Sequence, residues 1–335
     1  MAEVVDPSFN EVIALIRAAR AQAFQTVNTA LIDLYWQLGE YISRKVISSA
    51  WGEGVIDNLA CFIADGHPDL KGFTRSNLFR MRQLFEAYRD DEKVAPLVRQ
   101  LPWAHNLLVL SKCKLSEERE FYIRLAVRDR LPKRELERQI DGCLFERKVL
   151  APVKVSPLVT LLYPAVQEEF KDSYLVGFLD LPEQHSEKDL QKGLLKDLKK
   201  VLMELGRDFC FVGEEYRLQV GGQDFFVDLL FFHRGLSCLV AFEIKVTDFK
   251  PDYMGQLDFY LEALDRDVRK PHEKPSIGVL LCKSKDAEVV EYALSRTLSP
   301  ALVAEYKTRL PEKAFLQQKL REFYDLEADK KEGAQ

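Results

Sequence analysis

The stretch VDLLFFHRGLSCLVAFEIK, residues 227–245, decides the fold, because it is a run of apolar residues that still carries Asp228, Glu243 and Lys245. Runs this apolar normally enter a core. A charged side chain buried in a core is costly unless it is paired or binds a metal. The stretch therefore predicts a buried β-hairpin with a functional site, since something must offset the burial of three charges.

The alternation of side chains along a strand predicts where these charges lie. The stretch and its flanks predict a hairpin with strands at 224–232 and 237–246. On the second strand, Glu243 and Lys245 share a face and stand about 7 Å apart along the chain. Asp228 is expected across from Glu243 on the first strand, so two carboxylates and an ammonium meet on the sheet.

This trio predicts a metal site. Two carboxylates this close repel each other, and a divalent cation removes the repulsion. Mg²⁺ prefers oxygen ligands and keeps several waters, so Asp228, Glu243 and the backbone carbonyl of Ile244 are the expected ligands for Mg²⁺ or Mn²⁺. Lys245 is placed to orient a metal-bound water or to neutralise developing charge. The predicted reaction is phosphodiester hydrolysis, and the alternative is a buried Glu–Lys salt bridge that joins two strands.

The segments around this hairpin alternate between helical and strand periods, which predicts an α/β domain (α+β for the whole chain) with a mixed sheet flanked by helices. Gly221-Gly222 is a two-residue hairpin signal. The expected helices are 186–205, 251–264, 286–296 and 311–326, and the further expected strands are 209–220 and 276–284.

The first part of the chain predicts an all-helical domain. Apolar residues repeat at helical spacing from Val12 to Ile42, and shorter helices are expected at 55–64, from Thr74 to 89, and at 103–112, 116–129 and 132–146. Two prolines near 151–157 mark a break. We therefore expect a helical domain at 1–150, a linker at 151–173 and a nuclease domain at 174–328.

Basic residues gather in the helical part, although the net charge of the 335 residues is −5. Residues 71–150 carry 18 Lys and Arg against 12 Asp and Glu. The helix that Thr74 caps, with the helix and turn before it, resembles a helix-turn-helix in which this helix has the recognition role. Four arginines of this helix are candidates for nucleic-acid contact: Arg75, Arg80, Arg82 and Arg89. The alternatives are a solvated helix face, or a surface for self-association or for docking of another protein.

Composition excludes several classes of protein. No segment approaches the roughly 18 to 20 uninterrupted apolar residues of a membrane span, and the first residues lack a secretion signal. Six cysteines lie far apart without a CxxC pair, which favours reduced thiols in a cytoplasmic protein. The five histidines are scattered, so a zinc site is not expected.

The motif Asp-x(14)-Glu-x-Lys formed by Asp228, Glu243 and Lys245 resembles that of the PD-(D/E)XK nuclease superfamily. Longer segments resemble its bacterial YhcG-like family, and the similarity runs from about residue 10 to 300. These segments are VGEEYRLQVGGQDFFVDLLFFHRGLSCLVAFEIKVTDFKPDYMGQLDFYLEALD (212–265), SIGVLLCKSKDAEVVEYAL (276–294), GFTRSNLFRMRQLFEAY (72–88) and LPWAHNLLVL (101–110).

The resemblance implies a restriction-endonuclease-like domain in which the trio is catalytic, with a role in DNA recombination, repair or defence. Many such nucleases carry a metal-site glutamate on their first helix, and the residue that we align with it is Gln191. Gln256 and Tyr260, four apart on one side of a helix, are expected to face the scissile phosphate, and Lys250 to contact phosphate. The rivals are a binding or scaffold protein with a decayed site, which Gln191 favours, and a helix-turn-helix regulator.

Overall fold

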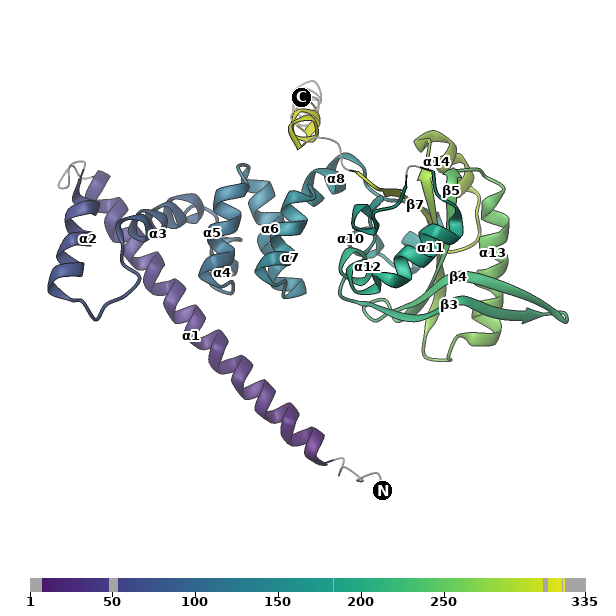
Figure 1. Ribbon diagram of the computed structural model, residues 1–335, viewed down its shortest axis with the longest axis horizontal. Coiled ribbons are helices and arrows are strands. Elements are labelled where there is room, and N and C mark those ends of the chain that lie inside the picture. Colours follow the sequence, from purple (N-terminus) through teal and green to yellow (C-terminus); the bar gives the residue numbers. More distant parts are fainter. Residues whose placement is uncertain (1–7, 48–53, 183, 310–312, 321, 323–335) are drawn as a thin grey trace. The chain divides into compact units, whose positions relative to one another are not determined.

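The computed structural model describes residues 8–47, 54–182, 184–309, 313–320 and 322 (Figure 1). The chain divides between Ile140 and Asp141 into two compact units, one helical and one built on a sheet. None of the described helices combines the length and the apolar composition that a bilayer crossing requires.

The helical unit is organised by the packing of α1 on α3. Its elements are α1 (Ser8–Ile47), α2 (Val55–Gly66), α3 (Arg75–Tyr88), α4 (Ala95–Val98), α5 (Trp103–Lys112), α6 (Ser116–Asp129) and α7 (Lys133–Asp141). The two helices cross closely because Gly39 has no side chain, and a Cβ there would meet the backbone carbonyl of Met81. The expected N-cap of α3 is confirmed, since the Thr74 hydroxyl accepts the Asn77 N–H at 3.4 Å.

The second unit contains a seven-stranded mixed sheet. Its strands are β1 (Lys154–Val155), β2 (Ser173–Leu175), β3 (Phe209–Val220), β4 (Gln223–His233), β5 (Cys238–Asp248), β6 (Lys274–Ser284) and β7 (Ala301–Lys307). The order is β1-β7-β6-β5-β4-β3, and β2 also pairs with β7. The β3–β4 and β4–β5 pairs are antiparallel, whereas β5, β6 and β7 run parallel.

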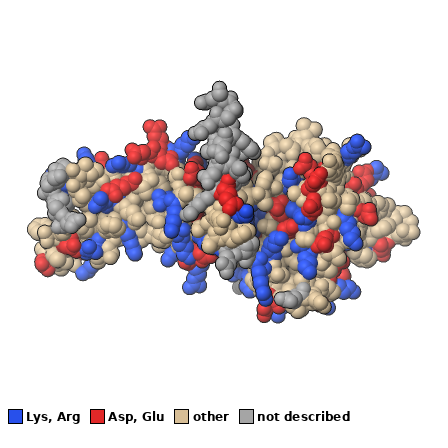
Figure 2. Space-filling view, turned by 90° about the horizontal axis from the view of Figure 1, so that it is seen from above, with Lys and Arg blue, Asp and Glu red and all other residues tan. Residues whose placement is uncertain are grey.

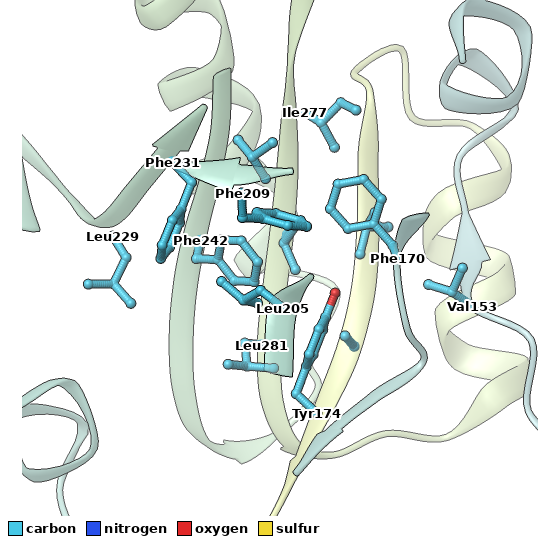
Figure 3. Packing of buried hydrophobic residues seen from close by; sticks show 14 of the residues in the cluster. Val153, Phe170, Tyr174, Leu205, Phe209, Leu229, Phe231, Phe242, Ile277 and Leu281 are labelled. Atoms are coloured by element: carbon cyan, nitrogen blue, oxygen red, sulfur yellow. The ribbon is translucent and has the colours of Figure 1, made fainter. Parts of the chain in front are cut away.

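Helices cover both faces of this sheet because each central strand is apolar on both sides. One face packs on α11 (Glu187–Lys196) and α12 (Leu198–Leu205), where Phe209, Phe231 and Phe242 form edge-to-face pairs with one another (Figure 3). The other face packs on α13 (Tyr253–Ala263) and α14 (Ala287–Ser295). Five shorter elements complete the unit: α8 (Leu144–Leu150), α9 (Pro157–Leu162), α10 (Val166–Glu169), η1 (Gly177–Leu179) and η2 (Leu264–Val268).

The predicted fold class is confirmed: a helical N-terminal region precedes a mixed sheet flanked by helices. The hairpin turn at Gly221-Gly222 has φ of 58° and 78°, as a type I′ turn requires. The strands predicted at 224–232 and 237–246 agree with β4 and β5 within two residues.

Several expected boundaries differ from the structure. Residues 151–173, expected as a linker, include β1, α9 and α10, and β1 pairs with β7 in the sheet. The expected helix 186–205 is two helices that meet at Asp197, and the expected helix 132–146 is divided at Cys143, which adopts a left-handed backbone. Strand β7 was not expected. Of the helix expected at 311–326, residues 313–320 are helical, and 311, 312, 321 and 323–326 lie outside the described residues.

Four of the six cysteines are buried, which agrees with the expected apolar surroundings, and Cys61 and Cys210 are exposed.

Candidate active site

Asp228, Glu243 and Lys245 come together where the β4–β5 ladder ends. The last backbone pair joins Leu229 to Phe242. Beyond it, Oδ2 of Asp228 accepts the backbone N–H of Ile244 at 2.7 Å, so a carboxylate takes the place of a strand carbonyl. Lys245 Nζ donates to Glu243 Oε1 at 2.8 Å. The hairpin thus holds two carboxylates and an ammonium at fixed positions.

Glu243 is the most enclosed of the three, at 3% exposure. Its Oε1 accepts the Lys245 ammonium, but its buried Oε2 has no hydrogen-bond partner among the described residues. A buried acceptor left without a partner carries a desolvation penalty of roughly 1–3 kcal/mol. The second oxygen is therefore available for a ligand from outside the chain.

The protonation of the trio is shifted by this enclosure. Burial, reinforced by the charge of Asp228, raises the pKa of Glu243 to about 7, against the opposing effect of Lys245. Burial also raises the pKa of Asp228, against the hydrogen bond from Ile244. Burial lowers the pKa of Lys245, but the hydrogen bond and charge of Glu243 outweigh it, so this pKa lies above its ordinary value. Without a cation, the site holds more protons than free carboxylates would.

Helix α11 brings a third carboxylate toward the trio. The charge of Glu187, on the first turn of α11, raises the pKa values of Asp228, Glu243 and Lys245. Four residues later, Gln191 Nε2 donates to the backbone carbonyl of Asp228 at 3.2 Å. Gln191 was expected near the metal site, whereas Glu187 was not. The spacing of four residues places both on the same side of α11, but it does not specify that this side faces the trio.

Helix α13 covers the site from the face of the sheet that carries Glu243 and Lys245. Gln256 Nε2 donates to the Tyr260 hydroxyl at 2.8 Å. Burial raises the pKa of Tyr260, and the charges of Glu243 and Asp228 raise it further, which places the hydroxyl within electrostatic reach of both carboxylates. The structure therefore brings Gln256 and Tyr260 to the side of α13 that faces the trio.

Tyr253, which our sequence analysis did not name, bounds the same site. The Lys245 ammonium lies 5.5 Å from the centre of the Tyr253 ring, within the range of a cation–π contact. The Tyr253 hydroxyl shares a 2.8 Å hydrogen bond with that of Thr247. Lys250 is exposed in the turn between β5 and α13, and no hydrogen bond or ion pair of its side chain is found among the described residues.

The donor set fits a divalent cation that keeps most of its waters. Within the described residues, no three His, Cys, Asp or Glu side chains lie close enough to enclose a metal by themselves. Mg²⁺ does not need such a cage, because it commonly binds through one or two carboxylates. The unpartnered Oε2 of Glu243, close enough to Asp228 for their charges to interact, suits this mode of binding.

Three of the four arginines, spaced seven residues apart, share one side of α3, and Arg80 lies on another side. Arg75 is exposed and ion-paired with Asp57 of α2. Arg82 is half-buried and pairs with Glu86 at 2.7 Å, and Arg89 pairs with Asp90 at 3.2 Å. Arg80 is exposed, and no ion pair of its side chain is found among the described residues. Thus Arg80 is the best placed of the four for an external partner.

Basic and acidic side chains are interspersed over the drawn face of both units (Figure 2). Several basic residues of 71–150 form local ion pairs. Two further examples are Arg124 with Glu120 at 2.7 Å and Arg138 with Glu135 at 2.7 Å.

Comparisons with known proteins match both halves of the chain. Residues 167–321 match the family model described as "YhcG PDDEXK nuclease domain", and residues 11–147 match the "DUF1016 N-terminal domain". The chain is 30% identical over 347 aligned positions to the protein named "Putative nuclease YhcG" from Escherichia coli (strain K12), with 92% of each covered.

Two solved structures show a more distant likeness. One is titled "crystal structure of a repair endonuclease from Pyrococcus abyssi" (14% identity, TM-score 0.26), and the other "Structure of EndoMS in apo form" (17% identity, TM-score 0.25). Each alignment covers 39% of this chain, and the chain spans about half the length of each of these proteins, 50% and 49%.

The family assignment thus rests on near full-length similarity in sequence, and the trio lies inside the matched nuclease domain. The chain belongs to the YhcG family, in which a DUF1016 N-terminal domain precedes a PDDEXK nuclease domain.

Proposed function

We propose that the protein is a metal-dependent nuclease that hydrolyses phosphodiester bonds in DNA, with Mg²⁺ or Mn²⁺ as its cofactor. The single observation that carries this proposal is the buried Oε2 of Glu243, which lacks a partner beside a second buried carboxylate. A purely structural salt bridge would be expected to provide partners for both oxygens of Glu243, because an unpartnered buried acceptor carries this cost.

Each residue of the trio has its own role in the proposed reaction. Asp228, Glu243 and the backbone carbonyl of Ile244 hold the cation, which supplies an activated water and stabilises negative charge on the phosphate. The N–H of Ile244 fixes the Asp228 carboxylate. Lys245, placed by Glu243 and the Tyr253 ring, orients the attacking water or neutralises the charge that develops on the phosphate.

The residues around the trio contribute charge and further contacts to the substrate in this proposal. Glu187, whose charge acts on Asp228 and Glu243, would add negative charge that favours the binding of a cation. Gln256 and Tyr260 bind the scissile phosphate or its neighbour from α13, because the Tyr260 hydroxyl accepts from Gln256 and is left with its own proton to donate. Lys250 contacts the phosphate backbone next to the site.

The helical unit supplies further contact to nucleic acid in this proposal. Arg80 reaches a phosphate or a base edge directly, and Arg75, Arg82 and Arg89 exchange their carboxylate partners for phosphate. Exposed ion pairs contribute little to stability, so this exchange costs little for Arg75 and Arg89. The biological setting that we propose is recombination, repair or defence against foreign DNA.

A second candidate is a nucleic-acid-binding or scaffold protein whose site has lost catalysis. Gln191 favours it, because an uncharged amide that donates to a backbone carbonyl occupies the place where a carboxylate was expected.

A cleavage assay separates the two candidates. The protein is incubated with circular single- and double-stranded DNA, with RNA and with a hybrid, each in Mg²⁺, Mn²⁺ or chelator. We expect cleavage of a DNA substrate that requires the metal and disappears in Lys245→Ala. Lys270→Ala is the matched control, because Lys270 is exposed and precedes β6 at the opposite end of the sheet. Binding that survives chelation without any cleavage would favour the scaffold.

A further inference from the structure

Helix α1 is apolar on two opposite sides, and its own unit covers only one of them. In its second half, the buried side contains Ile32, Tyr35, Gly39 and Ile42, of which Gly39 lies against α3 and Tyr35 against Phe73 and Trp103. The opposite side is exposed and still apolar, with Leu34 at 41% and Tyr41 at 48% exposure. A helix that is apolar on both sides is normally buried on both.

The first half of α1 has no covered side. Every residue from 11 to 27 is exposed, and in Figure 1 this part of the purple helix extends beyond the other helices of its unit. Leu15 is 70% exposed and Val27 is 68% exposed. Isolated helical segments of this length are marginal in water, because most helical stability in proteins comes from packing of an apolar face. This half therefore needs a partner surface.

The exposed apolar residues form one continuous line along both halves of α1. They recur mostly three or four residues apart, and each is exposed: Val12, Leu15, Ile16, Ala19, Ala23, Val27, Ala30, Leu34 and Tyr41. We call this line the outer stripe. Its length from Val12 to Tyr41 corresponds to about 44 Å of helix. None of its residues is charged, and the charged residues of the first half, Glu11, Arg17 and Arg20, lie outside it.

We propose that the outer stripe binds the outer stripe of a second copy of this chain, so that the protein is a homodimer joined through α1. This inference does not depend on the proposed nuclease activity. An uncharged stripe lies against its own copy without placing like charges opposite one another. Isologous contacts, in which both copies use the same surface, are the commonest way for a protein to form a dimer.

The pattern of side-chain sizes supports a helix of the same sequence as the partner. Ala19, Ala23 and Ala30 lie between larger residues of the stripe, with Ile16 before them, Val27 among them and Leu34 after them. Large side chains of one copy can therefore enter the spaces above the alanines of the other, which is how facing helices interdigitate.

The area of the stripe corresponds to a small protein–protein interface. A strip about 44 Å long and one helix wide, about 10 Å, has a projected area of about 440 Å² in each copy. Specific interfaces bury about 800 Å² per partner, and the accessible surface of protruding side chains exceeds their projected area. Ile13 and Phe24, which flank the stripe and are 45% and 67% exposed, add to this surface.

The oligomeric state of the full chain tests the proposal. Sedimentation equilibrium at micromolar concentration is expected to give twice the mass of one chain. Leu15→Glu combined with Leu34→Glu places charges in the stripe and is expected to give the monomer mass, with at least a tenfold weaker dimer. Gln25→Glu is the control for added negative charge, because it places one such charge on the other side of the uncovered half and should leave the dimer intact.

A second measurement tests whether the double variant is folded. Leu15 and Leu34 point away from the buried side of α1, so their replacement should not disturb the fold of the single chain. After correction for dimer dissociation, the unfolding temperature of the double variant should therefore equal that of the Gln25→Glu control at the same concentration. Hydrogen exchange over residues 11–27 should be slow in the dimer and should become fast on dilution or in the double variant. A wild-type chain that is monomeric, or a dimer that the double variant leaves unchanged, would overturn the proposal.

Discussion

At the residue scale, Glu243 shows how the fold prepares a site for a charged ligand. The strand holds a carboxylate with one oxygen on Lys245 and the other without a partner among the described residues. Burial and Asp228 then raise its pKa to about 7, so without a cation this carboxyl binds a proton more readily than a free glutamate does. A cation that binds there has to displace this proton, which couples metal binding to pH.

The raised pKa of Glu243 predicts how stability depends on pH. A carboxyl group whose pKa is higher in the folded state binds protons more tightly there, so it stabilises the fold at low pH and loses this contribution as pH rises through about 7. Without metal, the free energy of unfolding of wild type relative to Glu243→Gln should fall by about 2 kcal/mol from about pH 5.5 to about pH 8. Urea unfolding at both pH values measures it.

Added Mg²⁺ should restore the free energy of unfolding that the wild type loses at pH 8, and it should have little effect on the stability of Glu243→Gln. An equal pH dependence in the two proteins would show that Glu243 titrates as an ordinary exposed carboxyl.

Glu187 offers a separate test at the residue scale. Its charge raises the pKa values of Asp228 and Glu243, so Glu187→Gln should lower both. The same change should weaken Mg²⁺ binding several-fold in calorimetry, because negative charge is lost next to the cation. Glu288→Gln, in the first turn of α14, is the control for loss of an exposed helix-terminal charge. Unchanged affinity in Glu187→Gln would place Glu187 outside the metal environment.

The part of the site that lies on the two strands was predictable from the alternation of side chains along a strand. A hairpin with apolar strands is expected to bring Asp228 close to Glu243, and in the structure both residues lie directly beyond the last pair of the β4–β5 ladder. The roles of Glu187 and Tyr253 were not predictable in the same way. Both lie on helices whose rotation about their axes depends on packing against the sheet, which local sequence patterns do not specify.

At the element scale, α13 connects the stability of the sheet to the geometry of the site. Its Leu257 lies directly over Gly278 of β6, and a Cβ at Gly278 would stand 2.7 Å from Leu257 Cγ. The absence of a side chain at this position therefore sets the height of α13 above the sheet, and with it the positions of Gln256 and Tyr260.

Gly278→Ala is expected to destabilise the second unit by about 1–3 kcal/mol, because α13 has to move outward or Leu257 has to leave its position. Chemical denaturation measures the change. Gly255→Ala is the control on the same helix, since nothing lies within 4 Å of its Cβ position, and it should stabilise by about 0.5–1 kcal/mol through helix propensity. Two variants of equal stability would contradict the close contact.

Some strands and helix boundaries were predicted from the sequence pattern, and others were not. The central strands were predicted because their apolar runs are long and end at glycine turns. Strand β7 was missed because ALVAEYK is short and lacks such a turn before it. The interruption at Asp197 was missed because the apolar spacing of Leu190, Leu194 and Val201 continues through it.

At the scale of the whole molecule, the chain is two units with separate cores. The proposed metal ligands all belong to the second unit. Ligand binding stabilises only the unit that contains the ligand site, unless the two units unfold together.

Calorimetry of the full chain should therefore show two unfolding transitions, of which Mg²⁺ raises only one. Hydrogen exchange assigns that transition to residues 141–309. The transition of the helical unit should instead depend on protein concentration, as expected for association through α1. A single transition that Mg²⁺ shifts as a whole would show that the two units unfold cooperatively.

Strand β3 has one further consequence for the molecule. It is the outermost strand of the sheet, 12 residues long, and only β4 pairs with it. An open edge of this length could template the addition of a foreign strand and lead to aggregation. The pairing register of β3 shifts between Phe211 and Gly213, and Glu215 has a φ of 38°. This bend, together with the charged Glu214 and Arg217, makes the edge a poor template and keeps an exposed sheet margin compatible with solubility.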